Sequence, residues 1–134
     1  MTKENKVMVK FLAPFLLLAF LTAFGCANKN FVENGYDSIS TLNNSVDTLM
    51  VELGKKYRAG EITESQKEKI SEVYNKLRAA SDAADTALAM YATAQSEETQ
   101  EEFENKYYKA MAELEKNREV FMELASQFLE VKNE

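Results

Sequence analysis

The sequence predicts an all-α protein, an antiparallel three-helix bundle with up-down-up topology. Three long stripes of apolar residues recur at spacings of four and three, the pattern of helices that pack along a heptad seam. Turn signals stand at two places, and no alternating strand pattern of useful length occurs. Helices of similar length that are joined by short turns hide their stripes by packing antiparallel.

The first helix is expected over about 30–59. Gly60 ends it, because glycine reaches the left-handed conformation of a helix C-cap without steric cost. The seam contains one polar member, Asn43. Its full set is Val32, Tyr36, Ile39, Asn43, Val46, Met50, Leu53 and Tyr57.

The second helix is expected over about 64–94. Thr63 and Gln66 have the spacing of a capping box, in which each side chain accepts a hydrogen bond from the other residue's backbone N–H. The middle of this helix is rich in alanine, which allows neighbouring backbones to approach closely. The seam is Ile70, Val73, Leu77, Ala80, Ala84, Ala87 and Tyr91, flanked by Tyr74, Ser81 and Leu88.

The third helix is expected over about 97–132, with Ser96 as its N-cap. It carries the strongest periodic signal in the chain. Its seam is Phe103, Tyr107, Ala110, Leu114, Asn117, Phe121, Leu124 and Phe128. Because sustained heptads also suit coiled coils, a long helical hairpin that completes its core by oligomerising is the alternative architecture.

Two asparagines interrupt the apolar seams. Counting residues away from the turns places Asn43 opposite Ser81, and Asn117 opposite Tyr74. A buried amide needs a partner, so we expect these two pairs, or water in place of either partner. The asparagines fix helix register, as a buried Asn does in coiled coils, or they line a small polar pocket.

Acidic residues gather in the first turns of the third helix. Positions three and four apart share a helix face, so this cluster is a weak candidate for a divalent cation site. A solvated first turn that suits the helix dipole is the simpler interpretation. The residues are Glu97, Glu98, Glu101, Glu102 and Glu104.

No constellation for catalysis appears in the sequence. The chain has no histidine, the commonest general base and metal ligand, and its four glycines form no phosphate-binding pattern. We therefore expect a protein that is not an enzyme and has no cofactor other than a covalent lipid.

The N-terminal region has the order of an export signal. Three lysines precede an apolar run over 11–24, which is followed by Gly25 and by Cys26, the one cysteine in the chain. The junction resembles the lipobox of bacterial lipoproteins, with Ala23 in the place where leucine is usual. The resemblance implies a signal peptide over 1–25, cleavage between Gly25 and Cys26, and a lipidated Cys26. A short tether over 26–29 then leads to the bundle, which is expected over 30–134.

Two other interpretations of this region stay open. In the first, the apolar run is an uncleaved signal anchor. Against it, the run is shorter than the roughly 20 apolar residues that cross a bilayer, and Pro14 interrupts it. Alternatively, Cys26 is a buried core thiol.

The chain after residue 25 is acidic. The leader holds three of the 16 basic and one of the 22 acidic residues, which leaves a net charge of −8. Nucleic acids and anionic lipid surfaces are therefore unfavourable partners for the folded part. We expect membrane attachment through acyl chains.

The segment KKYRAGEITESQKEKI resembles the helical hairpin turn of small lipoproteins of bacterial and prophage origin. The resemblance implies an envelope component, or a phage-encoded protein that acts in superinfection exclusion or lysis. Ala27, where aspartate would signal inner-membrane retention, implies the periplasmic face of the outer membrane in a Gram-negative cell. Our preferred function is a structural or protein-interaction module with a protein partner or a second copy. The alternative is a small-molecule or metal carrier that uses the bundle interior.

Overall fold

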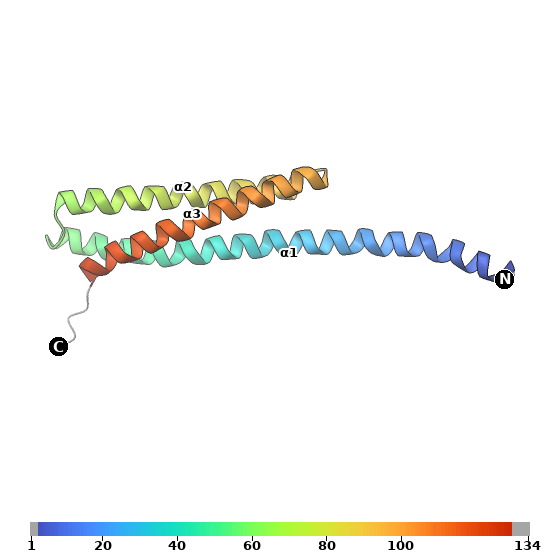
Figure 1. Cartoon of the computed structure of the whole chain (residues 1–134). Coiled ribbons are helices and arrows are strands. Elements are labelled where there is room, and N and C mark those ends of the chain that lie inside the picture. Colours follow the sequence, from blue (N-terminus) through green and yellow to red (C-terminus); the bar gives the residue numbers. More distant parts are fainter. Residues whose placement is uncertain (1–2, 130–134) are drawn as a thin grey trace.

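The computed structural model describes the backbone of residues 3–129 and the side chains of residues 29–129. It contains three helices, α1 (Lys3–Arg58), α2 (Glu64–Thr93) and α3 (Glu97–Leu129), and no strand in the described residues. Figure 1 shows that α2 runs back along α1 and that α3 returns again, so the end of α3 lies near the α1–α2 turn. Each helix packs against the other two, most extensively α2 against α3. The predicted all-α three-helix bundle is confirmed.

The helix bounds differ from the expected ones mainly at the chain ends. α1 begins at Lys3, ahead of the start expected near residue 30. The side chains of the leader, of Gly25 and of Cys26 lie outside the described residues, as does the expected end of the third helix at 132.

The turn between α1 and α2 closes the way its sequence predicts. Gly60 has a φ of 78°, the left-handed conformation. Its N–H donates to the Tyr57 carbonyl, and the Glu61 N–H donates to the Lys56 carbonyl, both at 3.0 Å. These two bonds form a Schellman motif, which satisfies carbonyls that the end of α1 leaves free. Ile62 then folds inward and is 3% exposed.

Capping side chains begin the second and third helices. The Gln66 N–H donates to Thr63 Oγ1 at 3.3 Å, and the Thr63 N–H donates to Gln66 Oε1 at 2.8 Å, which completes the predicted capping box. Ser96 and Thr99 make the same reciprocal pair of bonds at the start of α3, each at 3.3 Å. These local bonds explain why the starts of α2 and α3 follow from the sequence.

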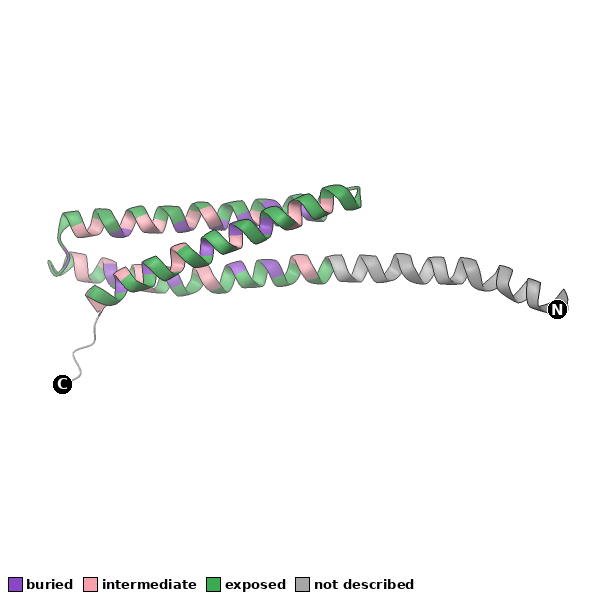
Figure 2. Ribbon diagram, in the orientation of Figure 1, coloured by how far each residue is buried: buried purple, intermediate pink, exposed green. Residues whose placement is uncertain are grey.

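The buried side chains form two clusters. Figure 2 shows the buried positions distributed along all three helices. The distal core lies toward the α1–α2 turn, and the proximal core lies toward residue 31 and the α2–α3 turn. The distal core consists of Val46, Leu53, Ile62, Ile70, Leu77, Leu114, Phe121 and Ala125. The proximal core consists of Ile39, Ala84, Ala87, Leu88, Tyr107 and Ala110.

The seam of α1 departs from the expected one near its described start. Tyr36, a predicted seam residue, is 40% exposed, whereas Gly35 is buried and Phe31 packs against the proximal core. Toward the N-terminus from Ile39, the packed positions follow every four residues, at Gly35 and Phe31. The reason is that a straight helix of 3.6 residues per turn drifts away from a strict heptad stripe. The absence of a side chain at Gly35 makes room for Leu88. A Cβ at Gly35 would lie 2.6 Å from the Leu88 Cδ1.

Two glycines of α1 provide a matched test of this close approach. Gly54→Ala should stabilise the protein by about 0.5–1 kcal/mol, because alanine favours a helix and the new Cβ would meet no atom nearer than the Arg58 Nη1 at 3.7 Å. Gly35→Ala should destabilise it by about 1–3 kcal/mol, because the Cβ overpacks the fully buried Leu88. Denaturant unfolding of both variants measures the difference. Equal stabilisation by the two alanines would show that Leu88 does not depend on the space at Gly35.

Candidate functional site

A hydrogen-bonded polar pair separates the two cores. The Asn43 Nδ2 donates to the Ser81 Oγ at 2.7 Å and so joins α1 to α2. Ser81 is 1% exposed. The Asn43 Oδ1 is buried and has no hydrogen-bond partner within the described residues. The pairing of Asn43 with Ser81 that counting predicts is confirmed, and it leaves one acceptor unsatisfied.

The second predicted pair, Asn117 with Tyr74, is wrong. The Asn117 Nδ2 donates to the Glu113 carbonyl of its own helix at 2.8 Å. The Tyr74 hydroxyl donates to the Asp47 Oδ1 on α1 at 3.1 Å. Asn117 is half-buried at the surface between α2 and α3, because the seam position drifts out of the core along the straight helix. A count of residues between α2 and α3 also leaves out α1, where the partner of Tyr74 lies.

The acidic first turns of α3 do not form a metal site in the described residues. Glu97, Glu98, Glu101 and Glu102 are exposed. Glu102 forms an ion pair with Lys106, one helical turn away, at 2.6 Å. Among the described residues, no three His, Cys, Asp or Glu side chains come together in a way that would hold a metal ion.

An aromatic cluster covers the proximal end of the bundle. The Phe31 ring centroid lies 4.6 Å from that of Tyr91, 5.4 Å from that of Tyr107 and 6.0 Å from that of Tyr108. Burial raises the pKa of Tyr91 and of Tyr107, and the neighbouring Tyr108 raises both further. Tyr108 itself is 54% exposed. The sequence analysis did not assign Phe31 to the core. Its place four residues before the buried Gly35 is the signal that would have identified it.

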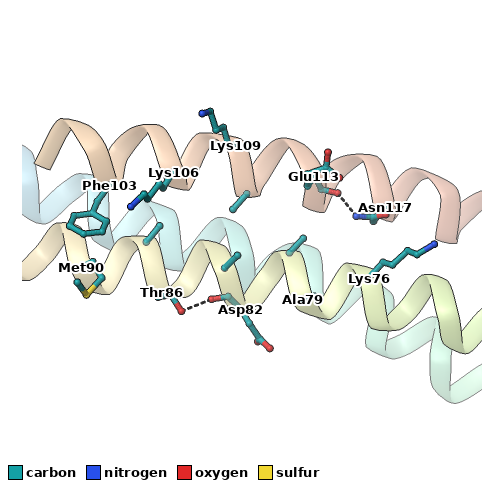
Figure 3. Close-up of a pocket in the computed structure, with 14 residues that line it drawn as sticks. Lys76, Ala79, Asp82, Thr86, Met90, Phe103, Lys106, Lys109, Glu113 and Asn117 are labelled. Carbon is teal, nitrogen blue, oxygen red and sulfur yellow. Dashed lines mark hydrogen bonds between the residues drawn. The ribbon is translucent and has the colours of Figure 1, made fainter. Parts of the chain in front are cut away.

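A groove of about 1030 Å³ lies between α2 and α3 (Figure 3). We call it the α2–α3 groove. Alanines make half of its α2 lining, and Met90 and Phe103 stand at one end. Its lining is Lys76, Ala79, Ala80, Asp82, Ala83, Thr86, Ala87, Met90, Phe103, Lys106, Lys109, Ala110, Glu113 and Asn117.

The groove gives the alanine-rich stretch of α2 a second role. Ala79 and Ala83 are exposed, whereas Ala84 and Ala87 belong to the proximal core. The groove residues of α3 include Phe103, Ala110 and Asn117, which the sequence assigns to the core seam. A second stripe beside that seam, at spacings of three and four on both helices, is the signal that sequence reasoning left unused.

Comparison of the chain with models of protein families, with curated proteins and with solved structures found no match. Within the described part of the chain, no helix has the length and apolar character needed to span a membrane.

Replacing both members of the polar pair tests what it does for stability. Ser81→Ala should cost about 1–3 kcal/mol, because it leaves both ends of the buried Asn43 amide unpartnered. Asn43→Leu with Ser81→Ala should be at least as stable as the natural chain, because no polar group then stays buried. Denaturant unfolding gives the stabilities. If the double variant loses several kcal/mol, the pair does more than fix register, and the pocket interpretation is favoured.

One partly buried carboxyl predicts a pH-dependent stability. Burial raises the pKa of Asp85 above its ordinary 3.8, and repulsion from Asp82 raises it further, while Arg78 acts in the opposite direction. The folded state therefore disfavours the charged form, so this contribution to stability is present at low pH and is lost as the pH rises through the raised pKa. Asp85→Asn should raise the melting temperature at pH 7 and leave it nearly unchanged at pH 3.

The exposed Asp37 provides the control for this measurement. Asp37→Asn should change the melting temperature little at either pH. A gain from Asp85→Asn that is equally large at pH 3 and pH 7 would contradict the electrostatic explanation.

Proposed function

We propose that this protein is a lipid-anchored component of the bacterial cell envelope that acts by binding protein rather than by catalysis. The observation that carries the proposal is the α2–α3 groove, an open and mainly apolar surface on an otherwise charged bundle. Long apolar grooves between two helices are surfaces onto which a further helix packs.

The anchor rests on the order of residues before the bundle. A charged leader, an apolar run and Gly25 followed by Cys26 favour export, cleavage and lipidation of the cysteine. Two or three acyl chains hold a protein stably at a bilayer, because each buried methylene contributes about 0.8 kcal/mol. Ala27 favours the outer membrane if the cell is Gram-negative. In this proposal the aromatic cluster around Phe31 is the part of the bundle nearest the lipid.

A carrier function for the bundle interior has less support. The polar pair of Asn43 and Ser81 is a direct 2.7 Å contact, and the two cores on either side are built from packed apolar side chains. The α2–α3 groove, by contrast, is an open surface depression of about 1030 Å³. We therefore place the binding function on the outside of α2 and α3.

Mass spectrometry of protein extracted from membranes tests the anchor. The main species should lack residues 1–25 and carry a diacylglycerol group on Cys26. Cys26→Ser is the matched control, and it should leave the chain uncleaved and without lipid. An intact Met1 on most molecules of the natural chain would overturn the anchor.

A further inference from the structure

Opposite charges stand on the two rims of the α2–α3 groove. Lys76 and Asp82 stand on the α2 side, and Lys109 and Glu113 stand on the α3 side. With Lys106 the lining holds three cations and two anions, although the whole chain has a net charge of −6. The ionised side chains of this face therefore sum to +1, so another acidic surface is repelled less here than the net charge of the chain predicts.

The position of each charge along the groove follows from the antiparallel packing. α2 ends at Thr93 and α3 begins at Glu97, so residues equally far from this turn lie at the same level. Lys76 is level with Glu113 to within a residue, and Asp82 is level with Lys109 in the same way. Figure 3 shows Lys109 and Asp82 on opposite rims at the same point of the groove. At each level, one rim is positive where the other is negative.

Within one copy these opposite charges do not pair across the groove among the described residues. Lys76 pairs with Glu72 at 2.8 Å and Glu113 approaches Lys116 at 4.0 Å, each on its own helix. Neither the Lys109 ammonium nor the Asp82 carboxylate has an ion pair in the described part of the chain. Both remain available to a second molecule.

We propose that the occupant of the α2–α3 groove is a second copy of this chain, related by a two-fold axis that runs parallel to the helices. In this arrangement α2 of one copy lies over α3 of the other at the same level. Asp82 then meets Lys109 of the second copy, Lys76 meets Glu113 of the second copy, and both contacts occur twice because the interface is isologous.

The apolar lining suits the same arrangement. Exposed Ala79 and Ala83 allow a facing helix to approach to the short end of the usual 8–10 Å range. Met90 is 45% exposed, and it stands with Phe103 at the end of the groove near the α2–α3 turn. Two copies bring these side chains together, which removes apolar area from water.

The parallel direction rests on the proposed lipid anchor. A two-fold axis along the helices puts residue 29 of both copies at the same end, where one membrane surface can hold both acyl groups. An antiparallel dimer would instead pair Lys76 with Asp82 and Lys109 with Glu113 of the second copy, and would place the two anchors at opposite ends.

Two charge reversals test the interface and its direction together. The full chain in detergent micelles is followed by sedimentation velocity, and mixtures of differently tagged chains are followed by native mass spectrometry. Asp82→Lys alone and Lys109→Glu alone should each raise the dimer dissociation constant about tenfold, because two exposed ion pairs become repulsive. Mixed together, the two variants should form heterodimers with affinity near that of the natural chain, since every reversed charge then faces its opposite.

A bulky side chain in the groove tests the same face without relying on charge pairs. Ala83→Arg should abolish the dimer, whereas Ala112→Arg, at an exposed position of α3 outside the groove, should leave it. Circular dichroism of both variants should match that of the natural chain, since neither position is buried.

Three results would overturn the proposal. The first is a natural chain that stays monomeric at 100 µM or above, a concentration of the order at which weak dimers are detected. The second is dimerisation that survives Ala83→Arg. The third is failure of the mixed Asp82→Lys and Lys109→Glu chains to associate, which the antiparallel pairing predicts. Cys26→Ser separates this proposal from the anchor, because it should remove the lipid and leave the dimer in micelles intact.

Discussion

The position of α2 between its two neighbours is the constraint on which the rest of this fold depends. On one side Leu77, Ser81 and Leu88 are almost fully buried against α1 and α3. Leu88 fits because α1 has a glycine, Gly35, at the point of closest approach. On another side the same helix exposes alanines along the α2–α3 groove. Large side chains on both sides would push α1 or α3 away, so the small residues of α2 are what allow it to contact two helices and still expose a groove.

The sequence predicts those parts of the fold that depend on local chemistry. Gly60, Thr63 and Ser96 each form bonds within a few residues of themselves, so the positions of the two turns follow directly from residue type. Counting from these turns also finds the contact of Asn43 with Ser81, because both lie on helices joined by the short first turn.

Features that depend on how a helix is rotated about its axis relative to two neighbouring helices cannot be predicted from residue type in the same way. Tyr36 and Asn117 both occupy heptad positions, yet each turns partly out of the core as the straight helix drifts from the stripe. Tyr74 pairs with Asp47 on α1, a partner that a count between α2 and α3 does not include. The groove was missed because exposed alanines and core alanines have the same spacing. Only the distance between the helix axes tells them apart.

The polar pair at Asn43 and Ser81 has a mechanical consequence for a protein held at one end. It divides the interior into two apolar cores, with the proximal core stacked beneath Phe31 and the distal core extending to the α1–α2 turn. A force applied through the start of the described part of α1 acts first on the ring contacts of Phe31 and on the packing of Leu88 over Gly35. The distal core is closed by the Schellman motif and the capping box, and it does not depend on those contacts. Under the proposed anchor, α1 can therefore peel back from Phe31 as far as the polar pair, while the far half of the bundle keeps its packing.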